Sequence, residues 1–136
     1  MQTRYPELAD DQRITLSSPH WSIRAAKAAP GRHAIALYHD DTFVDVLVQT
    51  PIYQGLIRDA WYGKGADGEA WTMAWGRLPA GATTVDVEFT GRGRTLHRTE
   101  PSVLAEAFWF AEAPGRFHRV SVSSGELRDV VRPAER

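Results

Sequence analysis

The chain contains no cysteine. Disulfide bonds, thiolate nucleophiles and cysteine-ligated metal sites are therefore excluded. It also has no run of about 20 apolar residues, the length that a membrane-spanning helix needs, so we expect no membrane partner. The segment from Met1 to Glu7 lacks the basic and apolar regions of a signal peptide, which predicts a cytoplasmic protein.

An excess of charge of one sign is also missing. The 16 Lys and Arg residues nearly balance the 17 Asp and Glu residues, which leaves a net charge of −1 at pH 7. Basic residues between Arg92 and Arg98 could meet phosphate, but Asp86, Glu88 and Glu100 are close in sequence and are expected to pair with them across strands. We therefore predict no nucleic-acid partner.

Apolar and aromatic residues are plentiful instead. They make up 43% and 10% of the 136 residues, enough to form the core of one ordinary domain. The first residues are polar and acidic, so the sequence predicts a flexible N-terminal arm over residues 1–13 and a single domain over residues 14–132.

In the second half of the chain, apolar residues alternate with polar or small residues with a period of two. Trp71, Met73 and Trp75 alternate with small or polar residues, and a similar run over 85–89 follows a Pro and Gly turn. This pattern is typical of half-buried antiparallel strands. About nine such strands recur at spacings of 8–12 residues, which predicts a mainly β fold, an antiparallel β-sandwich.

The clearest hairpin flanks Asp40 and Asp41, with strands predicted over 34–39 and 42–49. Aspartate tolerates the unusual backbone of tight hairpin turns. The second strand is rich in β-branched residues, with Asp45 as its one polar member between residues 43 and 48, and we predict that it is central in its sheet.

One segment departs from β patterning. Thr50 could cap a helix, Pro51 suits its first position, and apolar residues then recur every three or four positions before Gly63. We therefore predict a short helix near 51–62. The segment 102–113 has features of both states, and Pro114 directly after it favours a strand near 107–111.

The stretch Trp75–Val87 resembles a sequence pattern of a known group of proteins. This stretch is similar to the pattern G-x-x-P-x-G-A/V-x-x-V-x-V of uncharacterised bacterial proteins, with an aromatic strand at 108–110 and a final hairpin at 124–126. Those proteins are thought to contain small immunoglobulin-like β-sandwiches. The resemblance covers Trp75 to Val131, implies that fold, and brings no catalytic residue.

Motifs for cofactors are weak. Gly63–Gly68 spells G-x-G-x-x-G, but neither a strand before it nor a helix after it is predicted, so we expect a flexible loop. The histidines lack the paired spacing of metal ligands, and a site drawn from distant strands stays open. We therefore expect no cofactor and no metal. The histidines concerned are His20, His33, His39, His97 and His118.

Four aromatic residues suggest a contact surface: Tyr53, Trp61, Tyr62 and Trp109. Trp and Tyr offer rigid area with a polar tip. Trp109 alternates with Phe108 and Phe110, so its side chain points to the opposite face of the strand. If the outer face of this strand is exposed, its aromatic side chains would form an interface. If another segment covers that face, they would form a second small core. The leading hypothesis is a non-enzymatic binding or protein-interaction module, with a homodimer as one form.

The alternative is a small hydrolase or isomerase with an acid/base cleft between a sheet and the 51–62 helix. Asp45 together with a histidine would act there. Neither a Gly-x-Ser-x-Gly elbow nor a Ser-x-x-Lys motif occurs in the chain, so no nucleophilic residue is named.

Overall fold

The computed structural model describes residues 7–15, 20–27, 33–50 and 52–136. The chain is mainly β, with 61% of its residues in strands. No α-helix occurs in these ranges, and none of their helical turns could cross a membrane. The chain divides into two compact units, Met1–Ile52 and Tyr53–Arg136, which are described separately. The prediction of one domain over 14–132 stays a prediction.

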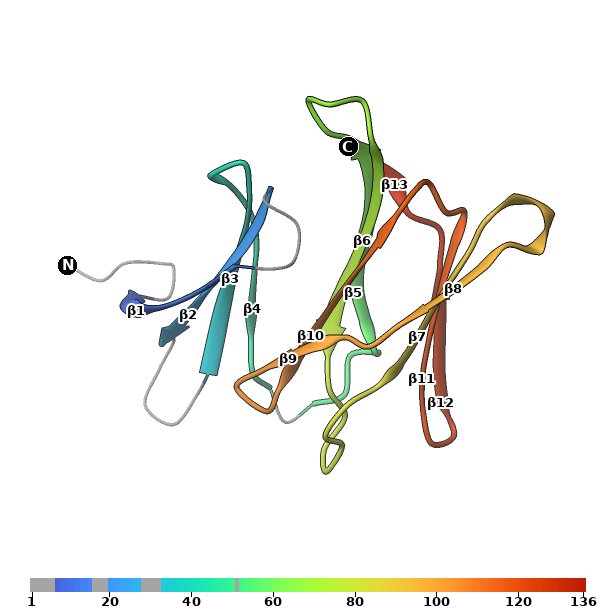
Figure 1. Cartoon of the computed structure of the whole chain (residues 1–136). Coiled ribbons are helices and arrows are strands. Elements are labelled where there is room, and N and C mark those ends of the chain that lie inside the picture. The colour runs from blue at the N-terminus through green and yellow to red at the C-terminus, as the bar shows by residue number, and fades with distance from the viewer. Residues whose placement is uncertain (1–6, 16–19, 28–32, 51) are drawn as a thin grey trace. The chain divides into compact units, whose positions relative to one another are not determined.

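The first unit is a four-stranded antiparallel sheet with the order β1-β2-β3-β4 (Figure 1). Large apolar side chains on one face of its strands are buried, among them Ile23, Leu37 and Leu47. The strands are β1 (Glu7–Thr15), β2 (Trp21–Lys27), β3 (His33–His39) and β4 (Thr42–Val48).

The predicted hairpin is confirmed, because Asp40 and Asp41 form the turn between β3 and β4. Both have positive φ, 49° and 65°, as a tight hairpin turn requires. The prediction that the strand carrying Asp45 is central is wrong, because β4 lies at the edge of this sheet. Of the predicted arm, residues 7–13 lie in β1 and residues 1–6 lie outside the described part.

The second unit contains two sheets. A five-stranded sheet has the order β13-β5-β6-β10-β9, and a four-stranded sheet has the order β12-β11-β7-β8. The strands of the first are β5 (Ile57–Lys64), β6 (Ala70–Arg77), β9 (Ser102–Leu104), β10 (Phe108–Pro114) and β13 (Ala134–Glu135). Those of the second are β7 (Asp86–Thr90), β8 (Leu96–Thr99), β11 (Arg119–Ser124) and β12 (Leu127–Val131).

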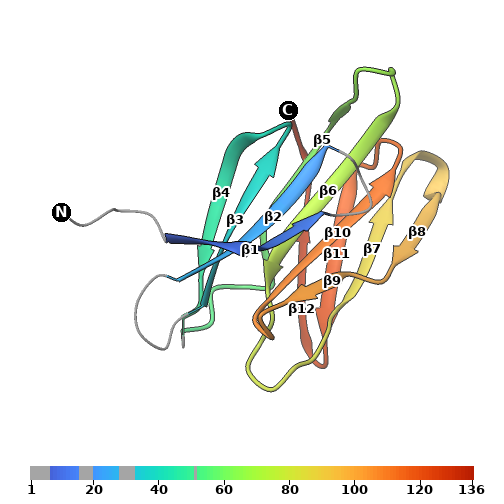
Figure 2. The same cartoon turned by 60° about the vertical axis from the view of Figure 1, so that its left-hand side comes forward.

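Both sheets of the second unit contribute to one hydrophobic core. Phe89 and Val122 come from the four-stranded sheet, and Ala74, Trp109 and Ala111 come from the five-stranded sheet. The chain passes from one sheet to the other between β8 and β9, which form one continuous run in both views (Figure 1, Figure 2). A single run of chain therefore forms an edge of each sheet.

The predicted helix near 51–62 is wrong. Thr50 does accept the N–H of Ile52 through its hydroxyl, at 3.3 Å, as a capping residue would. The chain then turns at Gly55, with φ of 93°, and enters β5. Ladder hydrogen bonds with β6 outweigh the weak local preference for helix, since propensity differences are below about 1 kcal/mol per residue.

Other strand predictions are confirmed. The ambiguous segment 102–113 forms β9, a turn and most of β10, so the predicted strand near 107–111 is confirmed. The strands predicted over 71–75 and 85–89 correspond to β6 and β7.

Candidate functional site

The four predicted aromatic residues do not share one surface. Tyr53, just before β5, is 54% exposed, whereas Trp109 on β10 is fully buried. The indole N–H of Trp109 donates to the carbonyl of Leu56 at 2.8 Å. Trp109 is therefore a core residue of the second unit, and the expected surface of four aromatic side chains is not formed.

Trp61 and Tyr62 are half-buried neighbours on β5. The guanidinium of Arg116 lies 4.3 Å from the centre of the Tyr62 ring and donates to its hydroxyl at 3.1 Å. Arg136 lies 5.1 Å from the centre of the Trp61 ring. Since successive strand residues point to opposite faces, the two rings cannot form a joint stacking platform, and each already contacts a cation of the chain.

Tyr53 lies close to Asp129 of β12. Partial burial raises the pKa of the Tyr53 hydroxyl above its usual value, and the negative charge of Asp129 adds to this effect. The Asp129 carboxylate accepts the backbone N–H groups of Leu56 at 2.5 Å and Ile57 at 3.2 Å. Its role is structural, because it ties the start of β5 to the other sheet.

The structure gives little support to the predicted acid/base pair of Asp45 and a histidine. Asp45 is half-buried, and its carboxylate accepts the N–H of Val46 at 2.9 Å. Its proposed cleft needs a helix at 51–62, where the chain forms β5. A histidine–carboxylate contact occurs elsewhere in the first unit, where His20 Nδ1 lies 2.7 Å from Asp40 Oδ1. Within the described ranges, no three His, Asp or Glu side chains could hold a metal ion.

The G-x-G-x-x-G segment is a hairpin turn. Gly63 ends β5 together with Lys64, and Gly65 accepts a hydrogen bond from Gly68 before β6 begins. A strand follows it instead of a helix, so the geometry that holds a pyrophosphate is not formed here.

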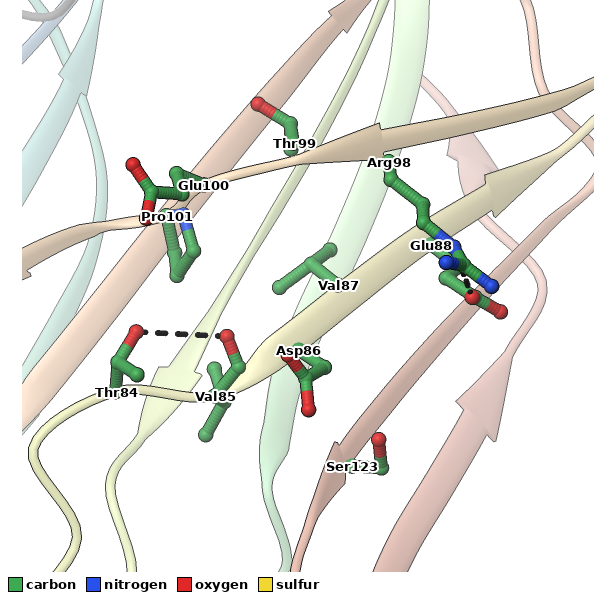
Figure 3. A pocket seen from close by; sticks show the side chains of 10 residues that line it. All are labelled: Thr84, Val85, Asp86, Val87, Glu88, Arg98, Thr99, Glu100, Pro101 and Ser123. Atoms are coloured by element: carbon green, nitrogen blue, oxygen red, sulfur yellow. Dashed lines mark hydrogen bonds and ion pairs between the residues drawn. The ribbon is translucent and has the colours of Figure 1, made fainter.

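A hollow of about 540 Å³ opens beside β7 in the second unit (Figure 3). It lies where the ladder between β7 and β8 stops. That ladder ends at the pair Val87–Thr99, whereas β7 pairs with β11 as far as Asp86. Beyond Thr99 the chain leaves through Pro101 for β9. The hollow is lined by Thr84, Val85, Asp86, Val87, Glu88, Arg98, Thr99, Glu100, Pro101 and Ser123.

The lining is charged and rich in hydrogen-bond acceptors. The lining includes three carboxylates, on Asp86, Glu88 and Glu100, and one guanidinium, on Arg98, so the formal charges sum to −2. Arg98 Nε lies 2.7 Å from Glu88 Oε2, which confirms the predicted cross-strand pairing for Glu88; the pairing predicted for Asp86 and Glu100 stays a prediction. Asp86 and Glu100 are exposed at the rim.

Sequence reasoning missed this hollow because it treated all three carboxylates as partners of the basic hairpin. The available signal was Pro101, which has no N–H and cannot continue a ladder after Thr99. That signal marks where pairing ends, but it does not reveal which strand loses its neighbour. Asp86, the first residue of β7, has no pair on β8, whereas residues 87–90 of β7 are all paired with it.

Comparison with known proteins adds no assignment. No protein-family model, no curated protein and no solved structure matches the chain. The immunoglobulin-like resemblance therefore stays an expectation, and the hollow beside β7 is the feature from which a function can be argued.

Proposed function

We propose that this chain is a non-enzymatic binding module whose partner is a protein. The observation that carries the proposal is the hollow beside β7, where the β7–β8 ladder ends and a polar rim surrounds the opening. Small-molecule sites are mostly apolar and bury most of their ligand. The hollow is lined mostly by charged residues and hydroxyls, so it suits the polar groups of a protein surface better than an apolar small molecule.

The fold that we infer for the second unit supports this function. We propose that residues 53–136 form an immunoglobulin-like β-sandwich. The support is a core to which both sheets contribute, together with the edge run that crosses between the sheets at β8 and β9. Variable immunoglobulin domains bind through loops at one end of the sandwich, and the hollow likewise includes residues of the chain just before β7 and just after β8.

Site-specific photocrosslinking tests the proposed function. The full chain, tagged and carrying a benzoylphenylalanine in place of Thr84 at the rim, is incubated with lysate of the organism that makes it. A matched variant carries the same group at Asp67, an exposed residue in the turn between β5 and β6. We expect one defined protein adduct from position 84 and none from position 67.

Two outcomes would overturn the proposal: no protein adduct from position 84, or the same adducts from both positions. An adduct between two copies of the chain at position 84 alone would support it and identify the partner as a second copy. Thermal unfolding of both variants controls for folding, since both positions are exposed and we expect melting temperatures close to that of the unmodified chain.

A further inference from the structure

The strand β5 in the second unit carries a seat for a short neighbouring strand. β13 pairs with it in parallel, opposite Trp61 and Tyr62. The N–H of Arg136 donates to the carbonyl of Tyr62 at 2.9 Å, and the guanidinium of Arg136 lies 5.1 Å from the centre of the Trp61 ring. The segment 134–136 is thus held by two neighbouring residues of one strand.

The length of this seat is limited. Because the carbonyl of Tyr62 points to β13, the backbone N–H of Ala60, two residues earlier, points to the same side of β5. That N–H already donates to the carboxylate of Asp59 at 2.8 Å. On the opposite strand, Pro133 directly before β13 has no N–H to donate. A longer strand would therefore meet an occupied N–H at Ala60, whereas a segment as short as 134–136 fits.

Only two residues connect this segment to β12. Arg132 and Pro133 lead from β12, at the edge of the four-stranded sheet, to β13, at the edge of the five-stranded sheet. Proline fixes its own φ and restricts the residue before it, so this hinge has few conformations. Short hinges favour the exchange of a segment between identical chains. The side chains of residues 134–136 are exposed, so the segment can leave its seat without opening the core.

From the seat and the hinge together, we propose that β5 accepts the segment 134–136 of a second copy of this chain, and that two copies exchange these segments in a two-fold dimer. Each copy donates one segment and receives one, so the contacts with Trp61 and Tyr62 form twice. This inference goes beyond the proposed function, because it uses β5 and not the hollow beside β7.

Disulfide cross-linking between two differently tagged copies of the full chain tests this inference, because the chain has no cysteine of its own. One copy carries Tyr62→Cys and the other Glu135→Cys, at positions that are paired between β5 and β13. Both copies are produced in the same cells, purified and oxidised. We expect a disulfide-linked dimer that contains both tags, because strands about 4.8 Å apart place paired Cα atoms within the range that a disulfide spans.

The matched control pairs Tyr62→Cys with Glu106→Cys, since Glu106 is also exposed but lies on the turn between β9 and β10. It should give only the background yield of the two-tag dimer. A longer hinge gives the second arm. Two glycines inserted between Arg132 and Pro133 let the segment reach its own β5 more easily, so the yield of the two-tag dimer should fall severalfold. The same insertion between Asp67 and Gly68, in an exposed turn, should leave the yield unchanged.

A two-tag dimer no more abundant than in the Glu106→Cys control would overturn the inference, and so would equal yields from the two insertions. A single chain that carries both Tyr62→Cys and Glu135→Cys gives a further check. If it cross-links only within itself, the segment stays on its own β5 and exchange is refuted. None of these results concerns the hollow beside β7, so the photocrosslinking test of the proposed function is decided separately.

Discussion

At the scale of single residues, Gly76 on β6 shows how tightly the second unit is packed. A Cβ atom there would lie 1.9 Å from the carbonyl oxygen of Leu56 and 2.8 Å from the indole nitrogen of Trp109. These two atoms are joined by the hydrogen bond that the buried indole N–H of Trp109 donates to the carbonyl of Leu56. The hydrogen on Gly76 is thus what allows β6 to pass beside that bond.

Replacing Gly76 by alanine should therefore cost several kcal/mol, because backbone or the Trp109 side chain must move to make room. Gly91→Ala is the matched control, since a Cβ there would meet its nearest neighbour, Phe117, at an ordinary 3.5 Å. Urea unfolding would compare both variants with the unmodified chain. Equal stability of the two variants would show that the contact at Gly76 is relieved at little cost.

At the scale of elements, the turn between β9 and β10 is built from unfavourable residues. Ala105 and Glu106 both have φ of 54°, and the N–H of Ala107 donates to the carbonyl of Leu104 at 3.0 Å. This is the geometry in which Asn-Gly is preferred, because residues with a Cβ pay about 1–2 kcal/mol in the left-handed region. The helix-like composition of this segment hid the turn from sequence reasoning.

Glu106→Gly should raise the stability of the chain by up to about 1 kcal/mol, because relief of the left-handed strain exceeds the entropic cost of a glycine. Thermal unfolding should show a melting temperature higher by a few degrees. Glu126→Gly serves as control, because Glu126 is also an exposed turn residue but does not have positive φ. A gain in both variants, or in neither, would contradict the strain argument.

At the scale of the whole molecule, charge is nearly balanced but unevenly placed. The net charge of the chain is −1, while the groups lining the hollow sum to −2. The excess of negative charge is therefore local to the lining of the hollow rather than a property of the whole chain. Exposed charges are screened within about 10 Å at 0.1 M salt, so this excess acts only at short range.

Local patterning was sufficient to predict the mainly β fold, the β3–β4 hairpin and most strands of the second unit, because alternation and turn residues are readable from neighbours in the chain. Local patterning failed where contacts between residues far apart in the chain determine the structure. Asp129 lies 73 positions from Leu56, and Trp109 lies 53 positions from it.

These long-range contacts make residues 57–64 a strand instead of part of a helix, and place Trp109 in the core instead of on a surface. The hollow likewise exists only because the chain stops pairing with β7 after Thr99 and continues into β9 of the other sheet. Composition and periodicity carry no information on which strand loses its neighbour, since that depends on contacts formed when the sheets assemble.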